Sequence, residues 1–151
     1  MQEPSVENGY QAELVDLLLN SFAQVVGRPL LPDNSTKAVY CADFPVLAHN
    51  GAEDPVLTYG NLAAQKLWEM SWEALTVLPS RLTAETAHRA QRDAMFAEMR
   101  ANGFIENYSG VRISASGRRF EIRNAVIWPL LNETGQKVGE AATFKEYSFL
   151  K

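Results

Sequence analysis

The last third of the chain most constrains its fold, because three runs of alternating apolar and polar residues follow one another there. The runs are FIENYSGVRIS (104–114), RRFEIRNAVIWPLL (118–131) and KVGEAATFKEY (137–147). The loops 115–117 and 132–135 join them, and each ends in glycine, which adopts positive φ at little cost. The pattern predicts a three-stranded antiparallel meander. In its middle strand Phe120 and Ile122 alternate with charged residues, so one face is buried and the other is wet.

Before this meander, the sequence predicts one helix and two more strands. Apolar residues recur at helical spacing in residues 10–26, and Gly27 marks the end of this amphipathic helix. Residues 38–49 and 55–60 have the composition of strands, and Pro45 interrupts the first of them. The sheet therefore has five predicted strands.

Three helical segments are predicted between the strands. Asn61, Ser71 and Thr83 each precede a helical stretch, and their side-chain oxygens can accept a free backbone N–H of the first turn. Gly103 closes the third and longest helix. The order of elements predicts the α+β class, with one five-stranded antiparallel sheet, helices on one face and an additional N-terminal amphipathic helix.

Length and charge limit the organisation and the partners of the chain. Its 151 residues suit one domain, predicted over residues 10–151, and the polar residues 1–9 are predicted to be a flexible N-terminus. The net charge of −4 argues against binding to nucleic acid or to an anionic membrane. The start of the chain is not a signal peptide and no apolar run is long enough to span a bilayer, so a cytoplasmic location is predicted. The arginines at 112, 118, 119 and 123 are interleaved with glutamates, which favours a solvated mixed-charge face.

Two long segments of the chain resemble a known family. HNGAEDPVLTYGNLAAQKLWEMSWEALTVLPSRLTAE (49–85) and GFIENYSGVRISASGRRFEIRNAVIWPLLNETGQKVGEAATF (103–144) resemble the MEKHLA domain, and the likeness extends over residues 14–147. Members occur as stand-alone bacterial proteins and at the C-terminus of a class of plant homeodomain–leucine zipper transcription factors. The family is similar in turn to PAS sensor domains. DNA binding is not expected here, because the chain contains no homeodomain or zipper.

The resemblance implies a PAS-like sheet, in which the first strand lies beside the last, and a pocket between the sheet and the helical block. It also implies that Asn61 is the asparagine with which a PAS strand starts the following helix. Light-sensing PAS domains use a cysteine of the helical block beside a flavin. The only cysteine of this chain, Cys41, lies in the predicted first strand, so a covalent flavin is not expected. A flavin bound without a covalent bond needs only aromatic walls and stays open.

A haem or other metal site is not expected either. PAS-type haem sensors bind the iron through a helical histidine, and His88 is on the third predicted helix. Arg89 and Arg92 lie close to it, which favours a solvated surface histidine over an axial ligand. His49 adjoins a turn, and two isolated histidines do not make a metal site. The cofactor is therefore unknown, and a small molecule bound without a covalent bond is the remaining hypothesis.

The strand parity predicts where a ligand would bind. Alternation beyond Phe120 places Asn124 and Trp128 on the same inward face as Phe120, unless a bulge reverses the parity. Asn107 and Ser109 share the inward parity of Ile105 in the preceding strand. A buried asparagine must find partners or cost about 1–3 kcal/mol, so it is either a structural link or a ligand hook. The candidate ligand-binding residues, from two strands and the helical block, are Trp68, Met95, Asn107, Ser109, Phe120, Asn124 and Trp128.

The sequence predicts a sensory, ligand-binding domain without catalytic activity. Trp68 and Trp72 are interpreted as core packing rather than as a cofactor box, because Ser71 reads as a new helix start. Cys41 and His49 could form a nucleophile–base pair, but no third group that would orient them is evident. The leucines of helix 10–26 could cap the sheet or pair with a second copy, so a homodimer is also predicted. An interaction module and a small α+β enzyme are the two alternatives.

Overall fold

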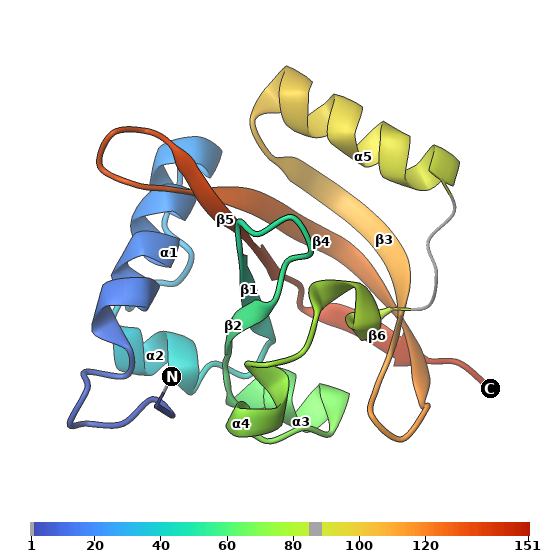
Figure 1. Cartoon of the computed structure of the whole chain (residues 1–151), viewed down its shortest axis with the longest axis horizontal. Helices are drawn as coiled ribbons and strands as arrows, with labels where there is room; N and C mark the ends of the chain where they lie inside the picture. The colour runs from blue at the N-terminus through green and yellow to red at the C-terminus, as the bar shows by residue number, and fades with distance from the viewer. Residues whose placement is uncertain (1, 85–88) are drawn as a thin grey trace.

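The computed structural model describes residues 2–84 and 89–151, and these fold into a twisted antiparallel sheet with helices on both faces (Figure 1). The helices are α1 (Ala12–Val26), α2 (Thr36–Tyr40), α3 (Leu62–Trp68), α4 (Trp72–Leu75), the 3-10 helix η1 (Ser80–Thr83) and α5 (Arg89–Asn102). The strands are β1 (Val46–Asn50), β2 (Leu57–Gly60), β3 (Ile105–Ile113), β4 (Arg119–Leu131), β5 (Lys137–Thr143) and β6 (Glu146–Phe149).

The strand order is β2-β1-β5-β4-β3, and all the neighbouring strands are antiparallel. The predicted meander is confirmed as β3-β4-β5, and the glycines of its two loops, Gly117 and Gly135, have φ of 87° and 82°. The first strand lies beside the last strand of the meander, as the resemblance implied. A sixth strand was not predicted: after Phe144 and Lys145 the chain resumes pairing with β4 as β6.

Helix α1 covers one face of the sheet, so the predicted amphipathic helix is confirmed. The indole Nε1 of Trp128 donates a hydrogen bond to the Leu18 carbonyl at 3.2 Å, and the ring of Phe22 lies edge-on to this indole at 4.8 Å. The Ser21 hydroxyl accepts a hydrogen bond from the backbone N–H of Leu131 at 2.9 Å. These contacts are made with β4. Helix α1 therefore covers its own sheet on the face opposite α3 and α5 (Figure 1).

The prediction of extended chain from residue 38 is wrong as far as Tyr40, where the short helix α2 forms. Ser35 is its N-cap, and the Ser35 hydroxyl accepts a hydrogen bond from the backbone N–H of Ala38 at 3.1 Å. A run of apolar residues this short suits a buried helical turn as well as a strand. The strand β1 begins only after Pro45, with Val46.

Helices α3 and α4 begin at the predicted N-caps. The Asn61 side chain accepts a hydrogen bond from the Ala64 N–H at 3.1 Å, and the Ser71 hydroxyl accepts one from the Ala74 N–H at 3.2 Å. Helix α5 ends at Gly103, which has a φ of 82°. The predicted cap at Thr83 is replaced by η1, and His88 lies outside the described residues.

The N-terminal segment makes specific contacts. The side-chain oxygen of Asn8 accepts hydrogen bonds from the backbone N–H groups of Ser5 and Gln11, each at 3.0 Å. The Thr36 hydroxyl donates a hydrogen bond to the Gly9 carbonyl at 2.7 Å. The flexibility predicted for residues 1–9 stays a prediction.

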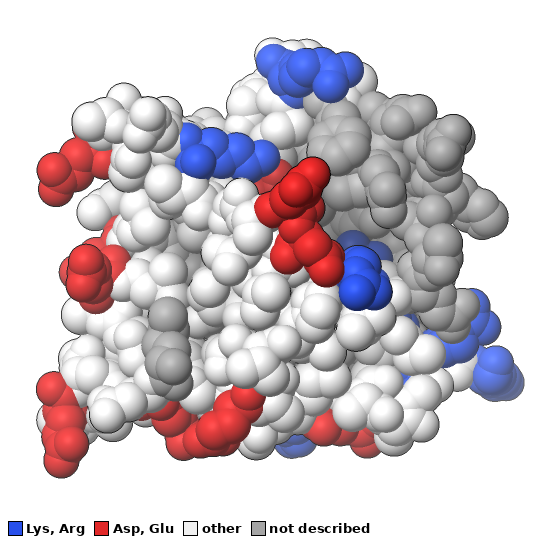
Figure 2. Space-filling view, in the orientation of Figure 1, with Lys and Arg blue, Asp and Glu red and all other residues white. Residues whose placement is uncertain are grey.

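Charged side chains are scattered over the face of the molecule shown in Figure 2. Acidic ones lie along the edge that carries α1, along the lower side and at the centre of this face (Figure 2). One exposed ion pair on this surface joins Arg81 and Asp54 at 3.3 Å. No helix within residues 2–84 and 89–151 has the length and apolar character needed to cross a membrane. The absence of nucleic-acid binding stays a prediction.

Candidate functional site

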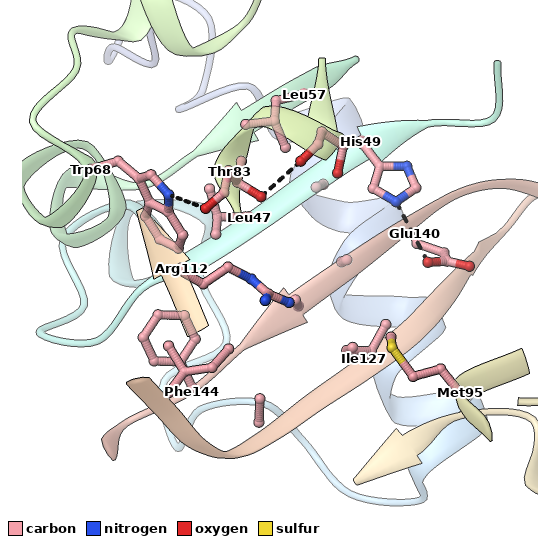
Figure 3. Close-up of a pocket in the computed structure, with 16 residues that line it drawn as sticks. Leu47, His49, Leu57, Trp68, Thr83, Met95, Arg112, Ile127, Glu140 and Phe144 are labelled. Atoms are coloured by element: carbon pink, nitrogen blue, oxygen red, sulfur yellow. Dashed lines mark hydrogen bonds and ion pairs between the residues drawn. The ribbon is translucent and has the colours of Figure 1, made fainter. Parts of the chain in front are cut away.

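A pocket of about 170 Å³ lies between the sheet and the helical block, on the face opposite α1 (Figure 3). The apolar walls come from strands and helices alike and include Leu47, Leu57, Trp68, Met95, Ile127 and Phe144. The polar side chains that line it are His49, Ser80, Thr83, Arg112 and Glu140. Apolar walls with a few convergent polar groups are typical of small-molecule sites.

A bulge at Asn124 decides which side chains of β4 face the pocket. Asn124 has a left-handed φ of 54°, which asparagine tolerates better than most residues. The extra residue resets the alternation, so Ala125 and Ile127 line the pocket together with Ile122. The prediction that Asn124 and Trp128 face inward is therefore wrong. Asn124 is exposed, and Trp128 is buried on the α1 face.

The neighbouring strand β3 has a similar irregularity. Asn107 has a φ of 57°, and the pairing with β4 shifts on both sides of Tyr108. Asn107 and Ser109 are exposed, so their predicted inward parity is also wrong. On β3 it is Arg112 that lines the pocket, with Tyr108 and Gly110 beside it. An asparagine inside each strand pattern is the sequence signal that could have indicated both bulges.

Trp68 and Met95 are the two predicted site residues that line the pocket, and Phe120 packs beneath Trp68. The Trp68 ring is 1% exposed and lies edge-on to Phe120 at 5.1 Å and to Phe144 at 6.1 Å. Its Nε1 donates a hydrogen bond to the Thr83 carbonyl at 3.2 Å, which ties η1 to α3. Trp68 is therefore both a core residue and a wall of the pocket.

The second tryptophan of the pair, Trp72, does not line the pocket. Trp72 begins α4, and its ring lies edge-on to Tyr59 at 5.7 Å in the other apolar cluster. The chain breaks its helix between the two residues, because Glu69 adopts a left-handed φ of 58° and Ser71 caps a new helix. The structure thus favours core packing over a two-tryptophan cofactor box.

Arg112 was predicted to belong to a solvated face, and this is wrong. It lies opposite Phe120 in the register of β3 and β4, and its side chain extends into the pocket (Figure 3). Its Nη1 donates a hydrogen bond to the Val111 carbonyl at 3.0 Å. A single bulge at Asn107 moved this residue from the predicted wet face to the pocket face.

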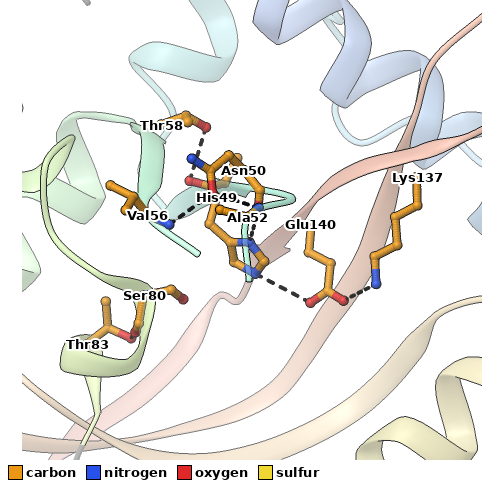
Figure 4. A network of polar contacts seen from close by, with 10 residues as sticks. His49, Asn50, Ala52, Val56, Thr58, Ser80, Thr83, Lys137 and Glu140 are labelled. Carbon is orange, nitrogen blue, oxygen red and sulfur yellow. Dashed lines mark hydrogen bonds and ion pairs between the residues drawn. The ribbon is translucent and has the colours of Figure 1, made fainter. Parts of the chain in front are cut away.

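His49 and Glu140 form a polar pair at the edge of the pocket (Figure 4). The histidine Nδ1 donates a hydrogen bond to the Asn50 carbonyl at 2.8 Å, and its Nε2 lies 3.5 Å from a carboxylate oxygen of Glu140. Lys137 holds the other carboxylate oxygen. Because both ring nitrogens face acceptors, the doubly protonated imidazolium fits this arrangement best.

The interaction between His49 and Glu140 shifts the pKa of each residue. Burial acts to lower the pKa of His49, but the hydrogen bonds to Glu140 and to the Asn50 carbonyl outweigh it and raise this pKa above 6.5. Burial acts to raise the pKa of Glu140, but His49 and Lys137 outweigh it and hold this pKa below 4.5. The charged forms of both residues therefore favour the folded state.

We expect Glu140→Gln to cost more stability at mildly acidic pH than at alkaline pH. The His49 contribution is complete below pH 6.5 and is lost as the pH rises through the higher folded-state pKa. The Glu140 contribution is present above pH 4.5 and is lost as the pH falls through the lower folded-state pKa. Urea unfolding at about pH 5.5 should show that the variant loses up to about 1 kcal/mol of its free energy of unfolding relative to the wild type. At about pH 8.5 this loss should be smaller. An equal loss at both values would contradict the pairing.

Cys41 is exposed after α2 and is not among the residues that line the pocket, although His49 is. In the described part of the chain, no three histidine, cysteine, aspartate or glutamate side chains come together as a metal site would require.

The sequence pattern that defines the MEKHLA domain matches residues 12–149. The chain belongs to the MEKHLA domain family. No curated protein matches it by sequence.

Solved structures show that this MEKHLA domain has a PAS-type fold. An RNA-binding light-oxygen-voltage receptor is 21% identical with a TM-score of 0.63, and the match covers 78% of this chain but only 33% of the receptor. The blue-light photoreceptor Vivid is 14% identical with a TM-score of 0.61 over 85% of this chain and 94% of its own. A PAS domain from Colwellia psychrerythraea is 14% identical with a TM-score of 0.60 over 73% and 91%. At these identities the likeness concerns the fold alone.

The pocket does not fit a flavin of the light-sensing kind. No cysteine lines it, and Trp68 fills part of the space between the sheet and the helical block. Its volume of about 170 Å³ is also well below the roughly 300 Å³ at which pockets for drug-sized ligands begin. A three-ring isoalloxazine is too large for this space.

Proposed function

We propose that this MEKHLA domain is a sensory module that binds a small molecule in the pocket between the sheet and α3, η1 and α5. The observation that carries the proposal is the combination of an apolar chamber with Arg112 and the His49–Glu140 pair in its lining. The chamber is bounded by β1, β4 and β5 on one side and by the helical block on the other. A ligand there would contact both layers, so its binding would bias how the helices sit on the sheet. No catalytic role is part of the proposal.

The pocket can be closed by a single substitution in the middle of β5. Ala142 pairs with Leu47 on one side and Ile127 on the other, and all three line the pocket. We expect Ala142→Leu to weaken the binding of a neutral one-ring probe, benzyl alcohol, by about tenfold or more. NMR titration of the wild-type protein and the variant measures this change.

Ala23→Leu is the matched control, because Ala23 is exposed on α1 and far from the pocket face. It introduces the same three carbon atoms outside the chamber, so probe binding should not change. The proposal fails if benzyl alcohol does not bind, or if Ala142→Leu binds it as tightly as the wild type does.

An interaction module remains the alternative function, and the predicted homodimer through helix 10–26 belongs to it. Helix α1 places Val15, Leu18 and Phe22 against its own sheet, whereas Glu13 and Asp16 lie on its exposed side. This arrangement leaves a charged surface on α1, which is a poor dimer interface. Light scattering over a range of concentrations tests whether a dimer forms.

A further inference from the structure

The pocket holds a cation that the described residues leave uncompensated. The guanidinium of Arg112 donates hydrogen bonds to two neutral oxygens of the described residues, the Val111 carbonyl at 3.0 Å and the Tyr108 hydroxyl at 3.4 Å. Among the side chains that the structure describes, in residues 2–84, 94–95 and 97–151, no carboxylate is at ion-pair distance from it. Five N–H donors belong to this group, so several remain for a ligand.

Strand β3 is built to place this guanidinium. The Tyr108 ring lies along the strand beside Gly110 and stacks on Arg112, with 5.5 Å between the guanidinium carbon and the ring centroid. A Cβ at position 110 would lie 2.7 Å from the Tyr108 hydroxyl and 3.1 Å from the Arg112 Nη1. A larger residue at this position would therefore push the ends of the Tyr108 and Arg112 side chains out of the stack. A donor fork held in place in this way loses little freedom when it binds a ligand.

Glu140, the acidic residue in the described lining, is already paired with basic side chains. Glu140 is engaged by His49 at 3.5 Å and by Lys137 on its other oxygen. Among the pocket-lining side chains that the structure describes, Arg112 is therefore the charged group that has only neutral partners. A guanidinium fork of this kind matches the two oxygens of a carboxylate.

The volume limits the rest of the ligand. An apolar cavity of about 150 Å³ accepts one benzene ring, and this pocket measures about 170 Å³. Trp68, Ile127 and Phe144 supply apolar walls around it. The body of the ligand is thus one ring or a branched chain of similar size.

We propose that the pocket binds a small monocarboxylate, with the carboxylate against Arg112 and an apolar body of about one ring against Trp68 and Ile127. This inference rests on the proposed function, because it names the ligand class of the same site. It assigns the recognition of charge to one residue, Arg112, and the recognition of size to the walls.

The experiment compares two probes of nearly equal size, benzoate and the neutral benzamide, by NMR titration of the whole chain. Benzoate should bind about tenfold tighter than benzamide or better, and Arg112→Gln should remove this preference by weakening benzoate binding much more than benzamide binding. Arg118→Gln is the matched control, since Arg118 is exposed and stacks on Phe149 outside the pocket. It should preserve the preference for benzoate.

The outcomes distinguish the proposal that the pocket binds a small molecule from the inference that this molecule is a carboxylate. If benzamide binds and is blocked by Ala142→Leu, but benzoate binds no tighter, the carboxylate inference is overturned and the pocket proposal stands. If neither probe binds to the wild type, both fail. If Arg112→Gln does not fold, the comparison of benzoate and benzamide on the wild type still tests the carboxylate inference. Tighter binding of benzoate, with shifts of the Arg112 Nε and Tyr108 signals, supports it. Equal affinities refute it.

Discussion

Asn61→Leu is expected to lower the free energy of unfolding by about 3 kcal/mol or more, because it leaves the Val46 and Ala64 N–H groups and the Phe44 carbonyl without their side-chain partner at about 1–3 kcal/mol each. The Val39 carbonyl keeps the Ala42 N–H at 3.4 Å. The Asn61 side-chain oxygen accepts hydrogen bonds from the N–H groups of Val46 and Ala64 at 3.0 and 3.1 Å. Its nitrogen donates to the carbonyls of Val39 and Phe44 at 3.0 and 2.9 Å. This one side chain, which is fully buried, joins α2, β1 and α3.

Urea unfolding followed by circular dichroism measures this loss. Asn20→Leu is the control, because Asn20 is exposed on α1 and the same change there should alter stability by less than about 0.5 kcal/mol. Since domains of this kind are stable by about 5–15 kcal/mol, this loss removes a large part of the stability, and the variant should unfold at a much lower urea concentration than the wild type. A loss near that of the control would mean that the four hydrogen bonds contribute little.

Trp68→Ala is expected to cost about 3–5 kcal/mol, since it removes a large buried ring and leaves a cavity between the sheet and α3. The variant loses the edge-on contacts with Phe120 and Phe144 and the hydrogen bond to Thr83. It also removes a wall of the pocket. The same substitution therefore tests the core and the site together.

The free energy of unfolding, again from urea titration, gives the result. Val77→Ala is the control, because Val77 is 72% exposed and its loss should be within about 0.5 kcal/mol. A Trp68→Ala protein that unfolds at the wild-type urea concentration would show that this ring does not hold the two layers together.

The strands of the meander and the helix caps were predictable because their signals are local. A glycine at Gly117 or Gly135 and the alternation on either side of it define a hairpin without reference to the rest of the chain. Asn61 and Ser71 act on N–H groups three residues away, so their role as caps is also readable from nearby residues. The extended segment before Pro45 was misjudged because a short apolar run does not distinguish a helical turn from a strand.

The candidate site was less predictable. Trp68 and Met95 were identified, but Asn107, Ser109 and Asn124 were assigned to the wrong face. Alternation was assumed to be continuous along each strand, and one left-handed asparagine in each strand interrupts it. The position of Arg112 in the pocket follows from this interruption.

The sequence by itself determined the α+β class, the order of the elements and the family, because spacing, caps and turn residues act over a few neighbours. Only the tertiary structure decided which face each side chain occupies and which distant residues meet. His49 and Glu140 pair because β1 and β5 are neighbours in the sheet, although 91 residues separate them in the chain. Such contacts depend on strand register and bulges, which are set by how the whole sheet packs against its helices and not by any short stretch of residues.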